Sequence, residues 1–183
     1  MKQEHLYSSD DKLKWWGYGE WVEEYDQAIF EHNGIECMVI RIAIQEPYSK
    51  EFHMFGGHLC GYIKVPDHHP YYGKGFDEID LESGCNGGLT YSEIDDQNHN
   101  YLHKKGHWIG FDCAHSFDIT PSMEYLKKTL PSMIECEKKL QKYKNLCPDS
   151  FLWHRSYKNM SYCIQECKNI ADELVNMVKN CGS

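Results

Sequence analysis

Arginine is scarce in this chain. Only two of its 19 basic residues, Arg41 and Arg155, are arginine, and 28 acidic residues give a formal net charge of −9. A protein that follows a nucleic-acid backbone or an anionic membrane needs a basic face, because it must neutralise a row of phosphates. The charge balance therefore argues against a nucleic acid polymer or a membrane as the partner. It favours a small molecule or another protein.

Long apolar runs are also missing. No stretch approaches the length of about 20 residues that spans a bilayer, and the first residues lack the basic and apolar segments typical of a signal peptide. The nine cysteines are an odd number and mostly lie singly in apolar segments, where a reduced cysteine behaves as a small hydrophobic residue. We therefore expect a cytoplasmic protein without a disulfide framework.

Metal-binding patterns are absent as well. Cys163 and Cys167 lie four residues apart on an expected helix, but no second cysteine pair accompanies them and no HExxH motif occurs. Eleven histidines make chance clusters common. We expect no bound metal, and no motif indicates a cofactor.

The first part of the chain, residues 1–118, consists of β-prone runs separated by loops. Each run is either alternating or continuously apolar, and Gly, Pro or Asn residues interrupt the chain between them. Residues 1–33, polar and aromatic, predict a loop or short helix that covers the core. The expected strands are residues 35–44, 58–66, 85–94 and 107–115.

The second part of the chain, residues 119–183, is helical in pattern. Thr120-Pro121 is typical of a helix start, Pro131 begins a second helix, and apolar positions from 160 to 178 form a helical stripe. Strands followed by helices predict one domain of the α+β class, with a mainly antiparallel sheet, helices on one face and a C-terminal helical segment.

Unusual polar residues concentrate in three segments that lie at or beside strand ends, where functional groups are commonly held. They are "PDHHP" (66–70), "NGGLTYS" (86–92) and "GFDCAHSFD" (110–118). Gly87-Gly88 lets the backbone approach a ligand closely, and its amides could hold a phosphate or carboxylate. A tight turn before a strand explains the same pair more simply.

The third segment contains candidate catalytic residues. Side chains alternate along a strand, so Cys113 and His115 should share one face and Asp112 the other. A thiol beside an imidazole is the pair that a cysteine nucleophile needs, and Asp118 is placed to orient the imidazole. Cys113, His115 and Asp118 are therefore catalytic candidates, although a buried cysteine beside a hydrogen-bonded histidine is the commoner arrangement.

Together the segments resemble a family of small phage and bacterial proteins. The chain carries that family's motifs as "GYIKVP", "HPYYG", "CNGGLTYS" and "HWIGFDCAHSFD", over residues 61–118. The family usually has His before the Gly pair, where this chain has Asn86. Asn can replace His as a hydrogen-bond donor but not as an acid or base. The resemblance implies one joint site, and its phage context implies an anti-defence protein that captures or destroys a nucleotide immune signal.

We expect first a protein that binds and sequesters a small nucleotide-derived signal. Proteins that act in this way are commonly oligomers, so we expect a homo-oligomer, in the host bacterial cytosol if a phage encodes it. The expected ligand-binding residues supply phosphate donors, stacking rings and acceptors for hydroxyls. They are His69, Asn86, Gly87, Gly88, Thr90, Tyr91, Trp108, Asp112 and His115.

Two alternatives stay open, and the sequence does not decide whether the protein is an enzyme. The first is a hydrolase acting on such a signal, or on an amide or ester. His115 would be the base, Asp118 its orienter, and Cys113 or water the nucleophile, with Asn86 and Gly88 stabilising the developing charge. The second is an interaction protein that inhibits a host protein through its acidic surface.

Overall fold

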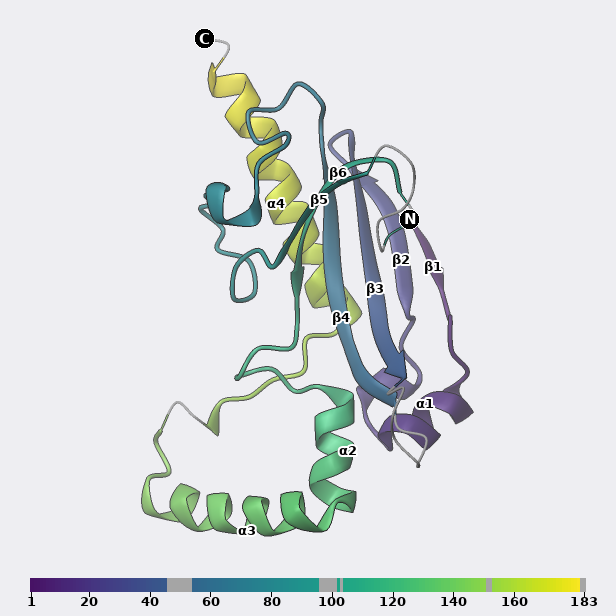
Figure 1. Cartoon of the computed structure of the whole chain (residues 1–183), viewed down its shortest axis with the longest axis vertical. Helices are drawn as coiled ribbons and strands as arrows, with labels where there is room; N and C mark the ends of the chain where they lie inside the picture. The colour runs from purple at the N-terminus through teal and green to yellow at the C-terminus, as the bar shows by residue number, and fades with distance from the viewer. Residues whose placement is uncertain (46–53, 96–101, 103, 151–152, 182–183) are drawn as a thin grey trace.

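The fold is built on a six-stranded antiparallel sheet with the strand order β1-β2-β3-β4-β6-β5 (Figure 1). It is seen in a computed structural model that describes residues 1–45, 54–95, 102, 104–150 and 153–181. The strands are β1 (Lys2–Glu4), β2 (Gln27–His32), β3 (Ile35–Gln45), β4 (Met54–Val65), β5 (Tyr91–Asp95) and β6 (Gly106–Asp112). The helices are α1 (Ser9–Trp16), α2 (Pro121–Thr129), α3 (Pro131–Leu146) and α4 (Met160–Cys181), with short 3₁₀ helices at Glu20–Val22 and Phe76–Glu78.

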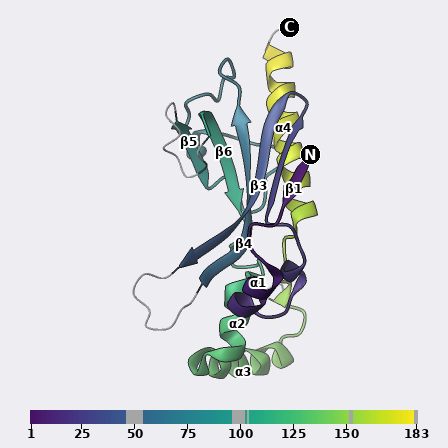
Figure 2. The same ribbon diagram turned by 90° about the vertical axis from the view of Figure 1, so that its right-hand side faces the viewer.

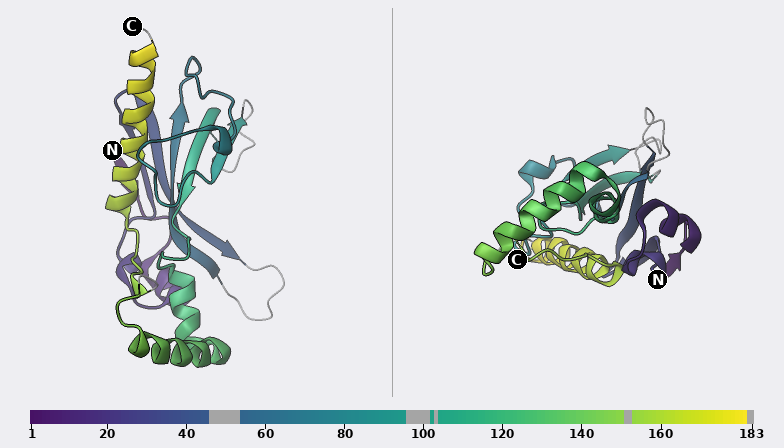
Figure 3. Two further views of the ribbon diagram at one scale, coloured as in Figure 1. Left: turned by 90° about the vertical axis from the view of Figure 1, so that its left-hand side faces the viewer. Right: turned by 90° about the horizontal axis from the view of Figure 1, so that it is seen from below.

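The α+β prediction is confirmed, and α4 covers one face of the sheet (Figures 1 and 3). Its buried stripe packs against inward-facing side chains of β3, β4 and β6, as the helical period of the sequence predicts. The segment between β4 and β5 packs on the same side. The stripe consists of Met160, Cys163, Ile164, Cys167, Ile170, Ala171 and Leu174.

The other face of the sheet has a smaller apolar cluster. Trp108, Tyr62 and Met38 are buried there together with Leu102, which follows β5 in the chain. The indole of Trp108 donates to the carbonyl of Lys105 at 3.1 Å. Apolar side chains of β3 and β4 are thus buried on both faces of the sheet, which explains the nearly continuous apolar character of these strands.

The β3–β4 hairpin bends where it extends past its neighbouring strands (Figure 2). The pairing register shifts between Arg41 and Ala43, and Gly56 and Gly57 opposite have φ values of +91° and +79°. Only glycine adopts such values without strain. At Gly57 a Cβ atom would lie 2.6 Å from Pro121 Cβ, so the bend forms the surface on which α2 begins.

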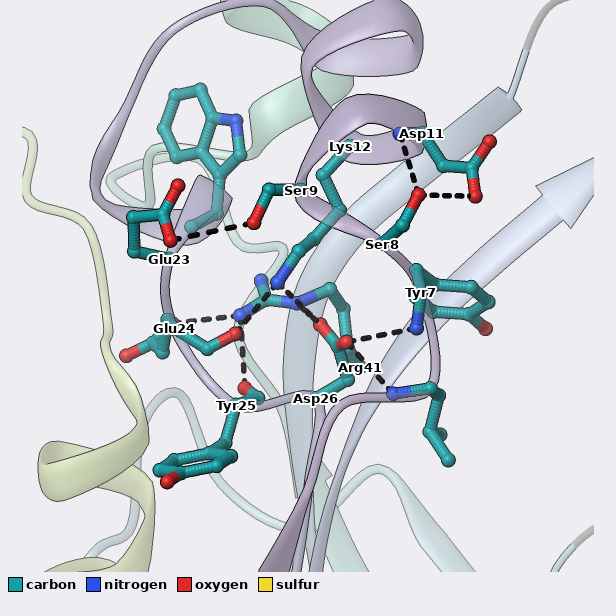
Figure 4. Close-up of polar contacts among 12 residues, drawn as sticks. Tyr7, Ser8, Ser9, Asp11, Lys12, Glu23, Glu24, Tyr25, Asp26 and Arg41 are labelled. Atoms are coloured by element: carbon teal, nitrogen blue, oxygen red, sulfur yellow. Dashed lines mark hydrogen bonds and ion pairs between the residues drawn. The ribbon is translucent and has the colours of Figure 1, made fainter.

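A buried ionic network fixes this bend (Figure 4). Arg41 donates from Nε to Asp26 Oδ1 at 2.7 Å, from Nη1 to the carbonyl of Gly57 at 2.6 Å, and from Nη2 to Glu24 Oε2 at 2.7 Å. Lys12 Nζ lies 3.3 Å from Asp26 Oδ1 and donates to the carbonyl of Glu24 at 2.6 Å. Burial lowers the pKa of Lys12. A buried charge is tolerated only when it is paired and hydrogen-bonded, and the three buried charged groups, Arg41, Lys12 and Asp26, all meet this condition.

The network also ties the amino-terminal segment and α4 to the sheet. Asp26 Oδ2 accepts from the backbone amides of Leu6 and Tyr7 at 3.0 and 3.1 Å. Glu24 Oε1 accepts from the amide of Met160 at 2.6 Å. This bond satisfies a free donor in the first turn of α4 and places a carboxylate at the positive end of the helix dipole.

Three of the expected elements differ from the structure. Residues 1–33 hold two strands besides a short helix, because β1 and β2 find partners in the sheet. Residues 85–90 form a turn, and β5 begins only at Tyr91. The strand expected over 107–115 ends at Asp112. The helix starts at Pro121 and Pro131 are confirmed.

Candidate functional site

Asn86, Asp112, His115 and Asp118 meet where β6 ends. The Asn86 amide nitrogen donates to the Asp112 carbonyl at 3.1 Å and to Asp118 Oδ2 at 2.9 Å, and it lies 3.4 Å from His115 Nδ1. Tyr162 of α4 donates its hydroxyl to Asn86 Oδ1 at 3.4 Å. Burial raises the pKa of Tyr162 to about 12. The expected proximity of "NGGLTYS" to His115 and Asp118 is confirmed.

The expected separation of Asp112 from His115 is wrong. It assumed an extended chain through residue 115, but β6 ends at Asp112 and the chain then turns. Asp112 Oδ1 accepts from the amide of Ala114 at 2.9 Å, and Asp118 Oδ2 accepts from the amide of His115 at 3.0 Å. Such side-chain bonds to nearby amides favour turns over strands. As a result His115 Nδ1 lies 3.7 Å from Asp112 Oδ1 and 3.4 Å from Asp118 Oδ2.

The Gly87-Gly88 pair makes a tight turn, with φ values of +74° and +95°. The amide of Gly88 donates to the carbonyl of Cys85 at 2.7 Å, so this amide serves the turn. At Gly87 a Cβ atom would lie 2.5 Å from His115 Nε2. Glycine is therefore needed here because the imidazole lies directly against the backbone.

Cys113 does not share a cavity with His115. Its side chain is buried in the core under α4, where its Sγ lies 3.6 Å from Cys163 Sγ. The contact with Cys163 and burial raise the pKa of the Cys113 thiol far above its usual range. A nucleophilic cysteine needs an accessible thiolate, so the structure corrects the nucleophile role proposed for Cys113.

Two further expected binding residues are buried, with their polar atoms already bonded. His69 accepts at Nδ1 from the amide of Tyr71 at 3.0 Å and donates from Nε2 to the carbonyl of Leu174 at 3.1 Å. It thus fastens the β4–β5 segment to α4. Trp108 is buried on the face of the sheet opposite α4, so its indole is not available to stack on a ligand.

Thr90 and Tyr91 lie at the start of β5. The amide of Thr90 donates to the carbonyl of Gly110 at 2.9 Å, and the Thr90 side chain is exposed. The Tyr91 ring packs edge-on against Tyr62, and its hydroxyl donates to Glu93 Oε2 at 2.8 Å. Of the nine expected ligand-binding residues, the structure thus brings Asn86, Gly87, Asp112 and His115 into one cluster.

A pocket that sequence reasoning missed adjoins this cluster. Its volume is about 280 Å³, and it lies between α2, α3 and the segment at Trp153 and Arg155. Its lining residues come from parts of the chain that only the fold brings together. They are Ile119, Glu124, Lys127, Glu137, Leu140, Gln141, Lys144, Trp153 and Arg155.

Arg155 connects the pocket to the cluster. Its Nη2 donates to the carbonyl of Asp118 at 2.7 Å, and its Nη1 lies 3.3 Å from Glu124 Oε1. Its Nε is buried and has no hydrogen-bond partner within the described residues. The rarity of arginine in this sequence was the one signal that singled out Arg155.

Comparisons of the chain with known protein families, curated proteins and solved structures give no match, so the site is interpreted from its own geometry. Over the residues that the structure describes, no group of three or more His, Cys, Asp or Glu side chains is placed to hold a metal ion. No helix in that part of the chain is both long and apolar enough to cross a membrane.

Proposed function

We propose that the protein binds a small anionic ligand with a flat ring, of the nucleotide class, in the pocket lined by Arg155. The main support is that Arg155 and Lys127, which carry guanidinium and ammonium donors, line this pocket together. An oxyanion in the pocket would accept hydrogen bonds from both groups.

The charges around the pocket support an anion. Lys127 Nζ lies 2.9 Å and Arg155 Nη1 3.3 Å from the same oxygen of Glu124, so one carboxylate faces two cations. Lys144 and Glu137 add one charge of each sign to the lining. The lining is therefore net positive in a protein whose overall charge is −9. Arginine and lysine are the usual ligands of phosphate groups.

The lining also offers a ring for stacking. Trp153 stands at the pocket wall, with its indole nitrogen donating to the carbonyl of Cys147 at 2.7 Å. Because this bond fixes the ring's edge, the ring can support a base with little loss of side-chain entropy. The volume is near the lower end of the range of about 300–1,000 Å³ typical of small-molecule sites.

The neighbouring cluster extends the proposal. Arg155 is bonded to Asp118, so a ligand against Arg155 lies near the edge formed by Asn86, Asp112 and His115. These side chains would accept from, or donate to, ribose hydroxyls. The resemblance of residues 61–118 to phage proteins adds the biological role: the ligand would be a nucleotide immune signal, sequestered in the host cytosol.

Calorimetry with a panel of mononucleotides, cyclic dinucleotides and cyclic ADP-ribose isomers tests the proposal. We expect at least one of them to bind, and to be recovered intact after the protein is heat-denatured. Arg155→Gln should weaken that binding by at least about tenfold, as expected for losing a hydrogen bond to a charged group. Lys128→Gln removes the same charge from an exposed position of α2 outside the pocket and should bind normally. A panel without any binding would contradict the proposal.

Hydrolysis of the same ligand is a second candidate, favoured by the position of His115. Its side chain is 32% exposed, and its Nδ1 lies 3.4 Å from Asp118 Oδ2, a pairing that suits a general base. With Cys113 buried, water would be the nucleophile. Chromatography of the ligand after long incubation distinguishes the two: a product that disappears with His115→Ala indicates hydrolysis, and intact ligand indicates capture.

A further inference from the structure

The helix α3 exposes most of its apolar side chains. It lies at the foot of the molecule, beyond the sheet and packed against α2 (Figures 1 and 3). Leu140, Tyr143 and Leu146 are 43%, 63% and 69% exposed, and Cys136 and Cys147 are exposed as well. A helix of this length usually buries its apolar stripe against another element.

The apolar positions of α3 follow the spacing of a coiled coil. Intervals of three and four residues alternate along the stripe, which is the a/d pattern that allows two helices to interlock. The side of α3 that lines the ligand pocket, at Glu137, Leu140, Gln141 and Lys144, overlaps the stripe at Leu140. The stripe consists of Met133, Cys136, Leu140 and Tyr143 of α3 and of Cys147, which directly follows the last residue of the helix.

Charge is distributed unevenly along the same helix. The acidic residues Glu135 and Glu137 lie in its first half, and the lysines follow toward its C-terminal end. Two copies of such a helix attract each other when they run in opposite directions, because each acidic half then faces a basic half. A parallel pair would place like charges together. The lysines are Lys138, Lys139, Lys142 and Lys144.

We propose that α3 is a dimerisation helix that packs antiparallel against α3 of a second copy of this chain. The two-fold symmetric arrangement uses the same patch on both copies. Because a and d positions face each other in an antiparallel pair, Leu140 packs on Tyr143 of the second copy and Cys136 on Cys147. The same register sets Glu137 against Lys144 across the interface.

A second copy fits this helix better than a partner of one charge sign. An acidic or a basic protein would match only one half of α3 and be repelled by the other. A second copy matches both halves and also presents the complementary apolar stripe.

Sedimentation equilibrium of the full chain tests the pairing. We expect a mass of twice the 21.5 kDa chain for the parent protein. Leu140→Asp should be a monomer. The Leu140 side chain is already exposed, so this substitution need not unfold the protein. Glu137→Lys and Lys144→Glu should each raise the dimer Kd by at least about tenfold, whereas the double swap should restore it. A monomeric parent protein, or a Leu140→Asp variant that still forms the dimer, would overturn the proposal.

Cross-linking tests the direction of the pair. Diamide, an azo oxidant, takes two electrons and two protons from two facing thiols and joins them as a disulfide. In a Cys181→Ser background we expect a covalent dimer that disappears in Cys136→Ser and equally in Cys147→Ser. A parallel pair would face each cysteine with its own counterpart, so either single variant would still cross-link, and that result would contradict the antiparallel register.

Discussion

At the scale of single residues, the amide of Asn86 holds the candidate cluster together. It bonds the Asp112 carbonyl and Asp118 Oδ2, and through its oxygen it reaches Tyr162. Three parts of the chain thus depend on one neutral side chain. A histidine at this position could not donate two bonds from one nitrogen, so these paired contacts need an amide side chain.

Asn86→Ala should lower the free energy of unfolding by about 1–3 kcal/mol, because it removes two donated hydrogen bonds, one of them to the buried carboxylate of Asp118. Urea denaturation followed by circular dichroism measures this. Thr90→Ala, at a nearby exposed side chain, is the control and should change stability by less than about 0.5 kcal/mol. Equal effects of the two changes would contradict the bonding role of Asn86.

The sequence predicted this meeting of segments but not its geometry. Of the three segments expected to form one site, "NGGLTYS" and "GFDCAHSFD" meet at Asn86, whereas His69 of "PDHHP" bonds the carbonyl of Leu174 in α4 instead. The end of β6 at Asp112 was missed because apolar alternation continues through Cys113, while the turn depends on side-chain bonds of Asp112 and Asp118. Arg155 was noticed only as a rare residue type, since its partners lie 31 and 37 positions away along the chain.

At the scale of elements, the bend of the β3–β4 hairpin decides where α2 begins. Gly57→Ala places a Cβ atom 2.6 Å from Pro121 Cβ, at a φ of +79°. We expect a loss of about 2–4 kcal/mol from overpacking and backbone strain together, measured by urea denaturation. Gly34→Ala is a matched control, with a φ of +81° and no atom within 4 Å of the new Cβ. Its cost should be about 1–2 kcal/mol, and equal losses for both variants would contradict the packing role of Gly57.

The ionic network joins α1, β3, β4 and the first turn of α4. Arg41→Met leaves the buried carboxylate of Asp26 without its main partner and should destabilise the protein by about 3–5 kcal/mol. The control is the ion pair of Lys64 with Glu36, in which the charged atoms lie 2.7 Å apart and the side chains are 33% and 49% exposed. Lys64→Met breaks this pair and should lower the free energy of unfolding by at most about 1 kcal/mol. Thermal unfolding of both variants checks the contrast. A small effect of Arg41→Met would mean that the network contributes little to the fold.

Local patterns predicted some elements better than others. The strands near 35–44 and 58–66 and the stripe of α4 were found because their periodicity is visible in the sequence alone. The strand β2 was missed, although Asn33-Gly34 after it is a typical hairpin turn. The three-residue β1 carries no such signal, since its conformation depends on pairing with β2.

At the scale of the whole molecule, three histidines make stability depend on pH. Burial lowers the pKa of His58, His69 and His107 below 6.5. The Nδ1 atoms of His69 and His107 accept from the backbone amides of Tyr71 and Gly73, so a proton there would break these bonds.

These histidines should make the protein less stable in mild acid. The unfolded chain takes up protons as pH falls through about 6.5, whereas the folded protein does so only at lower pH. The stability that these neutral histidines give the folded protein is therefore complete above pH 6.5, and it is lost as the pH falls toward their pKa values in the folded protein. Each contributes a slope of up to about 1.4 kcal/mol per pH unit. The urea concentration at the midpoint of unfolding should fall as the pH is lowered from 7.5 to 5, and it should fall less steeply in His107→Gln. A midpoint that does not change with pH would contradict this expectation.

The position of α4 in the chain has a consequence for synthesis. The last strand of the sheet ends at Asp112, but the helix that covers its apolar face begins only at Met160. At a translation rate of about 5–20 residues per second, the ribosome needs several seconds for the roughly fifty residues between them. During that interval the inner face of β3, β4 and β6 stays open to water on the nascent chain. A ribosome-associated chaperone that binds apolar segments would find its longest exposed surface there, and would be released when α4 docks.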